Sequence, residues 1–297
     1  MSQGRKEKLV SVGVPTYNRG ATFLRETLDS ICKQTYKNLE IIIADNASPD
    51  ITEEVCREYA KRDPRIRYIR QKTNIGPTAN FNVLHKEARG DYFMQTCDDD
   101  IIAPTFIEKC VARLDAHPEA AVAMSNFVEF DDKGRQVGFD PEKCVPSKKN
   151  LYERLKQYIL MYETDGKDRI MWGVWRREAA IPYVFDERPF PDPPGWDFED
   201  MSLVFLGLTK GACEFVNEIL FYKRAVPTAF DAPRHKGIIR KLFDSIVYSR
   251  LRRLFKPFFY KRMKVIISCG ELTLTERAKL LLWNKFVMSR LFWKRSI

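Results

Sequence analysis

Three consecutive carboxylates are the residues of this sequence best suited to chemistry. Asp98, Asp99 and Asp100 directly follow an apolar segment at residues 92–96 that is typical of a buried strand. Adjacent negative charges repel one another, and Mg²⁺ and Mn²⁺ prefer hard oxygen ligands, so a bound divalent cation explains the run best. A metal with open coordination positions can clamp phosphate oxygens. The run therefore predicts an Mn²⁺ or Mg²⁺ site for a diphosphate, and the alternative is a solvated acidic turn.

Polar residues also follow two other predicted strands. Pro-Thr-Tyr-Asn-Arg at 15–19 follows an apolar run at 9–14, and Asp-Asn-Ala-Ser at 45–48 follows another at 39–44. In parallel α/β sheets, ligands bind beyond the carboxyl ends of the strands, so we expect the three strand ends to share one cleft. The sequence contains neither GxxxxGK(S/T) nor GxGxxG, which argues against a P-loop ATPase and a dinucleotide-dependent oxidoreductase.

The elements that must position these residues alternate between strands and helices. Strand-like runs occur at 9–14, 39–44, 66–69 and 92–96. Helical patterns occur at 21–34, 50–63, 78–88 and 104–114. Asp50 and Glu53 have the spacing of a capping box at the start of the second helix. The alternation predicts an α/β fold with a Rossmann-like, mostly parallel sheet flanked by helices.

The charge distribution divides the chain into a body and a basic tail. The 297 residues carry a net charge of +10, and residues 236–297 alone carry +13, so 1–235 are nearly neutral. No apolar run approaches the ~18 residues that cross a bilayer, and no signal peptide is evident, so we expect a cytoplasmic protein.

The tail is predicted to form amphipathic helices. One spans about 238–255, and the other follows a capping box of Thr273 and Glu276. Amphipathic, basic and aromatic helices are typical of membrane interfaces, so we expect the tail to bind an anionic membrane surface. The alternatives are packing on the body or a homodimer. Nucleic-acid binding is not expected, because no motif for it is visible.

A histidine follows the last predicted strand of the body, at 219–222. His235 lies between Arg234 and Lys236. It could complete the metal or diphosphate site, while the two cations neutralise the leaving nucleotide. The alternative is a solvated loop histidine.

Six segments, in this order, resemble the inverting glycosyltransferases of family 2. They are SVGVPTYNR, LEIIIADNASPD, NIGPTANFN, GDYFMQTCDDDIIAP, GVWRRE and WDFEDMSLVFLGLTKG, within about residues 8–225. The resemblance implies a GT-A fold, a nucleotide-sugar donor and a divalent metal. It makes 1–235 the catalytic domain, with a donor half at about 1–125 and an acceptor half at about 126–235. Residues 236–297 would be a basic helical C-terminal extension.

The resemblance also implies which residues bind the donor. They are Pro15, Thr16, Tyr17 and Arg19 around the nucleoside, Asp45 on the base, Asn74 at the edge of the cleft and Asp98 on the ribose. An ionised Asp45 can only accept hydrogen bonds, and uracil and thymine present an N–H donor, which favours UDP or dTDP. For Asn74 and the nearby Gly76, a purely structural turn is the alternative.

At the metal, this chain departs from the usual Asp-x-Asp pattern, because Cys97 stands at the first acidic position. The resemblance then assigns Asp99 to the metal, with Asp100 as a supporting carboxylate.

In the acceptor half, the resemblance implies that Asp200 is the base that takes the proton of the acceptor hydroxyl. Glu199 would orient this base or bind the acceptor, Asp197 is the substitute base, and a helix N-cap is the alternative role. Trp172 and Trp175 would line the sugar side, and core packing is their alternative.

The sequence thus predicts a metal-dependent inverting glycosyltransferase, peripheral on the inner face of the plasma membrane. It would move sugar from a nucleoside-diphosphate sugar to a glycan or lipid-linked glycan during polysaccharide biosynthesis. The alternatives are transfer to a polyprenyl phosphate, or a catalytically idle nucleotide-sugar-binding scaffold.

Overall fold

The computed structural model describes residues 7–130, 136–138, 145–161, 167–180, 199–224 and 263–290. Its strands are β1 (Val10–Thr16), β2 (Leu39–Asp45), β3 (Ile66–Arg70), β4 (Tyr92–Gln95), β5 (Ile101–Ile102), β6 (Ala120–Phe130), β7 (Gln136–Gly138), β8 (Val174–Arg176) and β9 (Ala212–Arg224). Its helices are α1 (Leu24–Cys32), α2 (Thr52–Arg62), α3 (Pro77–Glu87), α4 (Phe106–Ala116), α6 (Leu151–Leu160), the 3₁₀ helix η1 (Lys167–Trp172), α7 (Glu199–Gly207) and α9 (Leu274–Arg290).

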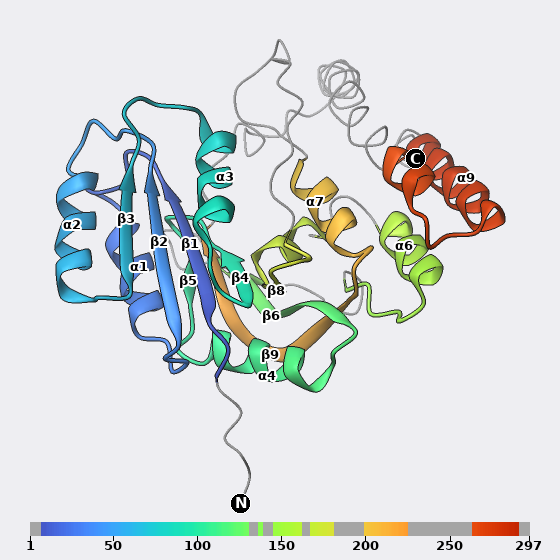
Figure 1. The fold of residues 1–297 in the computed structure, drawn as a ribbon, viewed down its shortest axis with the longest axis horizontal. Coiled ribbons are helices and arrows are strands. Elements are labelled where there is room, and N and C mark those ends of the chain that lie inside the picture. The colour runs from blue at the N-terminus through green and yellow to red at the C-terminus, as the bar shows by residue number, and fades with distance from the viewer. Residues whose placement is uncertain are drawn as a thin grey trace, which may run out of the picture.

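One sheet runs through the described residues, in the order β3-β2-β1-β4-β8-β6-β9-β5, with β7 beside β6 (Figure 1). The first four strands pair in parallel, as the alternating pattern predicts. Their register places Thr16 opposite Asp45, and Asp45 opposite Arg70. The carboxyl ends of β1, β2 and β3 are therefore level, and their last residues lie side by side.

Helices cover both faces of this parallel part. Val12 and Ile41 belong to the core cluster that includes Leu28 of α1, whereas Ile42 packs with Leu84 of α3 on the opposite face. A Cβ atom on Gly13 would lie 3.0 Å from the Leu84 side chain, so α3 packs directly over β1. Burial on both faces explains why these strands are continuous apolar runs.

The second half of the sheet is joined through the short strand β8. It pairs antiparallel with β4 on one side and with β6 on the other. Strands β6 and β9 pair in parallel, and β9 is much longer than the strand predicted at 219–222. The sheet is therefore parallel around the three predicted strand ends and mixed beyond β4.

The C-terminal helix α9 lies beside α6, on the side of the molecule opposite α2 (Figure 1). Its predicted capping box is confirmed, because Thr273 N donates to Glu276 Oε2 at 2.8 Å and Glu276 N donates to Thr273 Oγ1 at 3.2 Å. Leu280 is buried on the face toward the body. The helix predicted at 238–255 lies outside the described residues. None of the described helices is both long and apolar enough to cross a membrane.

The predicted capping box of α2 is wrong. Asp50 Oδ1 accepts from Thr52 N at 3.0 Å, while Glu53 pairs with Arg57 and Arg70 instead of capping the helix. Glu53 is held by Arg57 one turn along α2 and by Arg70 of β3, and Asp50 also accepts from Gly20 N in the loop after β1, which belongs to the site described next.

Candidate active site

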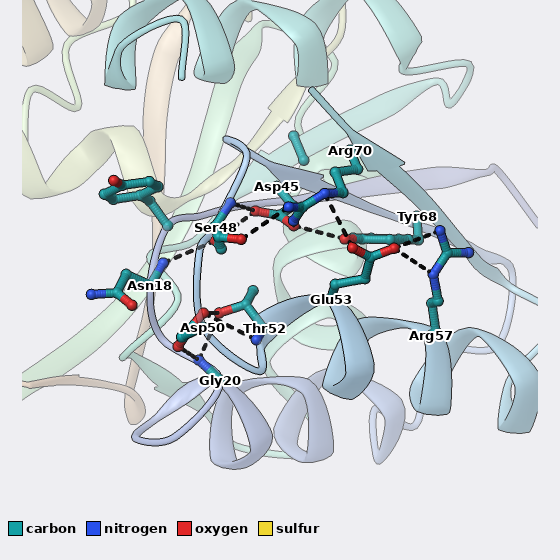
Figure 2. A network of polar contacts seen from close by, with 12 residues as sticks. Asn18, Gly20, Asp45, Ser48, Asp50, Thr52, Glu53, Arg57, Tyr68 and Arg70 are labelled. Atoms are coloured by element: carbon teal, nitrogen blue, oxygen red, sulfur yellow. Dashed lines mark hydrogen bonds and ion pairs between the residues drawn. The ribbon is translucent and has the colours of Figure 1, made fainter. Parts of the chain in front are cut away.

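The loop after β1 is fixed by the loop after β2. Asn18 has a φ of 59°, in the left-handed region that asparagine tolerates, and its N–H donates to Ser48 Oγ at 2.9 Å. Arg19 N donates to Thr52 Oγ1 at 3.1 Å. Gly20 N donates to Thr52 Oγ1 at 2.8 Å and also to Asp50 Oδ2 (Figure 2). The backbone of the predicted nucleoside loop is therefore held by hydrogen bonds on three successive residues.

Asp45 ends β2 as a fully buried carboxylate. Its Oδ1 accepts from the N–H and hydroxyl of Ser48, at 2.9 and 2.5 Å. Its Oδ2 accepts from Tyr68 OH at 2.7 Å and from Arg70 Nη1 at 2.6 Å. Burial alone would raise its pKa, but the hydrogen bonds from Ser48, Tyr68 and Arg70 outweigh burial, so the pKa of Asp45 lies below its ordinary value. Asp45 is thus an ionised acceptor, as the resemblance requires.

The guanidinium of Arg70 is oriented by three different groups. Besides Asp45, it contacts Glu53 Oε2 through Nε at 3.2 Å and donates to Ser48 O through Nη2 at 3.0 Å. Glu53 is held in turn by Arg57, whose guanidinium also lies over the Tyr68 ring (Figure 2). A guanidinium has five N–H groups, so after these contacts Arg70 retains donors for a ligand.

Asp98 and Asp99 face the β1 loop. Tyr17 N approaches Asp98 Oδ2 at 3.4 Å, and Arg19 lies 3.6 Å from Asp98 Oδ1 and 3.8 Å from Asp99 Oδ2. Burial, reinforced by the negative charge of Asp99, raises the pKa of Asp98 to about 6. The structure thus brings together Tyr17, Arg19, Asp98 and Asp99, which the sequence placed at two different strand ends.

Asp100 points away from this loop, toward β9. Its Oδ1 accepts from Arg224 N at 3.0 Å, and its Oδ2 lies 3.6 Å from Lys223 Nζ without a hydrogen-bond partner. Burial raises the pKa of Asp100 to about 6, although Lys223 opposes the shift.

The acidic run offers a suitable donor set for a divalent cation. Cys97, Asp99 and Asp100 can each place one ligand atom within 4.8 Å of the others. Burial raises the pKa of the Cys97 thiol well above its ordinary value, so the thiol stays protonated and neutral. The available ligands are then carboxylate oxygens, including the unsatisfied Oδ2 of Asp100, which fits Mn²⁺ or Mg²⁺.

Asn74 makes contacts typical of a turn. Its Oδ1 accepts from Asn46 Nδ2 and from Gly76 N, both at 2.9 Å, and Gly76 has a φ of 84°. Asn46 also accepts from Ile75 N at 2.8 Å. These bonds shape the turn before α3, which agrees with the purely structural role given above as the alternative for Asn74 and Gly76.

The two tryptophans occupy different environments. Trp175 donates to Met171 O at 3.2 Å, and a Cβ atom on Gly207 would lie 2.3 Å from its ring, so it packs in the core. Trp172 lines a small pocket together with Lys223, whose Nζ lies 5.5 Å from the centre of the Trp172 ring. Of the two, Trp172 is therefore the one that adjoins the acidic run.

The predicted catalytic residues are described only in part. Glu199 and Asp200 are the first two described residues of α7, but their side chains lie outside the described part of the structure. Asp197 and His235 also lie outside the described residues.

Sequence reasoning missed the residues of β9 that contact the acidic run. Lys223 and Arg224 are distant in sequence from Asp100, and no local pattern marks them. Arg70 directly follows the strand predicted at 66–69, but its pairing with Asp45 follows only from the strand register.

An Asp–Arg pair and an acidic cluster around one loop, at the carboxyl ends of parallel strands, are in the position where α/β proteins with open sheets bind nucleotides. The family model described as "Glycosyl transferase family 2" matches residues 11–177, more than half of the chain. The chain therefore belongs to glycosyl transferase family 2.

Individual proteins agree with this assignment. The chain is 34% identical over 125 residues to the glycosyltransferase GlyG of Streptococcus pneumoniae serotype 4, covering 42% of this chain and 41% of GlyG. Such matches cover about half or less of the length of the curated relatives.

Solved structures share the fold. Staphylococcus aureus TarS 1–349 in complex with UDP-GlcNAc matches with a TM-score of 0.65 at 17% identity, over 97% of this chain and 74% of that one. The mannosyltransferase PcManGT from Pyrobaculum calidifontis, in complex with GDP-Man and Mn²⁺, matches with a TM-score of 0.53 at 17% identity, over 98% and 77%. At these identities the likeness concerns the fold, and the predicted GT-A fold is confirmed.

Proposed function

We propose that this chain is a metal-dependent inverting glycosyltransferase whose donor is a nucleoside-diphosphate sugar. The observation that carries the proposal is the convergence of three strand ends. The buried Asp45–Arg70 pair, the fixed loop at residues 17–19 and the carboxylates Asp98 and Asp99 lie along the carboxyl edge of the parallel strands. These groups suit a base, a ribose and a metal-bound diphosphate, in that order.

The base site suits uracil or thymine. Each of these bases presents an N–H between two carbonyl groups, and the Asp45–Arg70 pair presents an acceptor beside donors. Because four donors already surround the Asp45 carboxylate, the base N–H would replace one of them. UDP or dTDP is therefore the favoured donor nucleotide, and the UDP-GlcNAc complex of TarS supports this choice by analogy.

At the metal site, Asp99 and Asp100 would hold Mn²⁺ or Mg²⁺, with Asp98 toward the ribose. The bound cation would neutralise the charge that develops on the leaving diphosphate. The Mn²⁺ complex of PcManGT is consistent with this role.

In the proposed reaction, Asp200 takes the proton of an acceptor hydroxyl as that oxygen attacks the anomeric carbon. The new carbon–oxygen bond forms while the bond to the diphosphate breaks, so the nucleoside diphosphate leaves and the anomeric configuration inverts. Glu199 would orient this base. A glycan or lipid-linked glycan of a surface polysaccharide is the proposed acceptor. Competition by undecaprenyl phosphate, but not by sugars, would instead indicate polyprenyl-phosphate transfer.

The structure offers one argument for a peripheral membrane location. On α9, Leu282 and Phe286 are 67% and 47% exposed, and the exposed Lys279 and Lys285 lie on the same face. An exposed apolar pair flanked by cations suits the anionic inner face of the plasma membrane. The same pair could instead contact a second copy in a homodimer, which sedimentation without lipid would reveal.

The deciding experiment measures the midpoint of thermal unfolding with UDP, dTDP, GDP or CMP, with and without Mn²⁺. A ligand that binds only the folded state raises this midpoint by mass action. We expect a metal-dependent rise with UDP or dTDP that disappears in Asp99→Asn. A protein that responds to no nucleotide would refute the donor site. Nucleotide binding without any turnover would favour an idle scaffold.

A further inference from the structure

Arg19 lies against the two carboxylates that the proposed function places nearest the ribose and the metal. Its Nε is 3.6 Å from Asp98 Oδ1, and its Nη2 is 3.8 Å from Asp99 Oδ2. Charge-assisted N–H···O bonds are ordinarily about 2.7–2.9 Å long, so both contacts are loose ion pairs. Arg19 therefore neutralises the carboxylates without being locked to them.

Two cations of β9 also contact the acidic run, but at groups other than the carboxylates of Asp98 and Asp99. Lys223 pairs with the Asp100 carboxylate, and Arg224 donates from Nε to the main-chain oxygen of Asp99 at 3.2 Å and from Nη2 to Glu26 at 2.7 Å. The Arg224 guanidinium also lies close to the rings of Phe23 and Phe130. Among the described residues, Arg19 is the cation that forms ion pairs with both Asp98 and Asp99.

The backbone of Arg19 is fixed, whereas its side chain makes long contacts, namely the two ion pairs and a Phe23 ring whose centre lies 6.0 Å from Cζ. Its N–H is bonded to Thr52 Oγ1, and Asn18 and Gly20 on either side are bonded to the same neighbouring loop. A Cβ atom on Gly20 would lie 2.4 Å from Thr52 N, so the two loops are in close contact. The side chain is 34% exposed, which leaves room for the guanidinium to turn.

We propose that Arg19 is a displaceable counter-ion of the metal site. It neutralises Asp98 and Asp99 in the metal-free protein, and it transfers its pairing to the donor diphosphate when a divalent cation occupies the carboxylates. Arg19 thus competes with the metal and assists the nucleotide, which makes the two ligands bind cooperatively. The coupling is reciprocal, so each ligand raises the affinity for the other by the same factor. The inference deepens the proposed function and rests on it.

The test uses the full chain and two binding measurements that do not depend on turnover. The first is the affinity for Mn²⁺ alone, followed by the electron paramagnetic resonance of free Mn²⁺. The second is the affinity for UDP at saturating Mn²⁺, by calorimetry. The variants are Arg19→Gln, which keeps a polar side chain without charge, and Arg19→Lys, which keeps the charge. Arg25→Gln is the matched control, because Arg25 pairs with Glu58 on the surface instead of with the acidic run.

We expect Arg19→Gln to bind Mn²⁺ alone about five- to ten-fold more tightly, and UDP with Mn²⁺ about ten-fold more weakly. Arg19→Lys should stay closer to the wild type in both measurements, and Arg25→Gln should differ from it less than two-fold. An Arg19→Gln protein with unchanged Mn²⁺ affinity would show that Arg19 does not compete with the metal for the carboxylates. Unchanged UDP affinity would show that Arg19 does not pair with the diphosphate. A wild-type protein that binds neither Mn²⁺ nor UDP would overturn the proposed function itself, and the inference with it.

Discussion

The guanidinium of Arg70 donates from Nη1 to Oδ2 of Asp45 at 2.6 Å, which joins the ends of two neighbouring strands, β3 and β2. Asp45 is fully buried, while the Arg70 side chain is 31% exposed. One partner is therefore fixed in the core, and the other reaches the solvent side where a ligand arrives. This asymmetry makes separate predictions for the two residues.

Removing Arg70 should impair binding more than folding. In Arg70→Ala we expect UDP affinity to fall about ten-fold or more, because a donor to the base is lost. Arg70→Lys should recover only part of it, since an ammonium lacks the planar fork. Calorimetry with Mn²⁺ present measures both. Full UDP affinity in Arg70→Ala would show that Arg70 does not bind the nucleotide base.

Removing Asp45 should impair folding as well. Asp45→Ala leaves the hydroxyls of Ser48 and Tyr68 and the guanidinium of Arg70 without their shared acceptor. Unsatisfied donors of this kind cost about 1–3 kcal/mol each, so we expect the free energy of unfolding to fall by about 3 kcal/mol. Urea denaturation measures the loss, and Arg70→Ala provides the matched comparison. Equal stability of the two variants would contradict the buried role of Asp45.

The acidic run should give the metal-free protein an unusual pH dependence. Burial raises the pKa of Asp98 and of Asp100 to about 6, above the ~4 of an unfolded aspartate. The folded state then binds more protons than the unfolded state between pH 4 and 6. This contribution to stability is complete below pH 4 and is lost as the pH rises through 6.

Thermal unfolding at several pH values, in the presence of EDTA, measures this effect. In Asp98→Asn, the unfolding temperature should fall less steeply between pH 4 and 6 than in the wild type. Mn²⁺ added in place of EDTA should reverse the fall in the wild type, because the cation stabilises the ionised carboxylates. A variant whose profile matches that of the wild type would show that Asp98 does not titrate in this range.

The proposed base can be separated from its neighbour. We expect Asp200→Asn to lower kcat about 10²- to 10⁴-fold with little change in UDP affinity, because the proton acceptor is lost while the donor site is intact. Glu199→Gln, one residue away, should retain more activity. Initial rates with a labelled donor give both values. Undiminished turnover in Asp200→Asn would show that another carboxylate is the base.

The exposed face of α9 makes a prediction about lipid. Changing both Leu282 and Phe286 to Glu should abolish flotation of the full chain with anionic vesicles, since the apolar contact is lost and negative charge is added. Ile219→Glu, at a residue of β9 that is 48% exposed, is the control and should float like the wild type. A wild-type chain that stays with the protein fraction at low salt would exclude the membrane role.

The parallel half of the fold could be predicted from sequence, because strands buried on both faces leave continuous apolar runs and the helices between them keep a helical period. The same logic placed Asp45 and the acidic run at strand ends. The three-residue strand β8 is too short to leave a period. Glu53 does not cap its helix because it pairs with Arg57 one turn further along and with Arg70 of β3. Contacts such as Asp100 with Lys223 depend on the pairing of distant strands, which one sequence does not reveal.

The short strand β8 has a consequence for how substrates enter. By pairing with β4 on one edge and β6 on the other, it joins the parallel strands β1–β4 to β6 and β9 in one hydrogen-bonded sheet. Opening a hinge between the two sides would break main-chain bonds in the middle of a sheet. We therefore expect substrates to bind and products to leave through movements of the loops at the edge of a rigid sheet. An opening of the two halves of the sheet about a hinge is not expected.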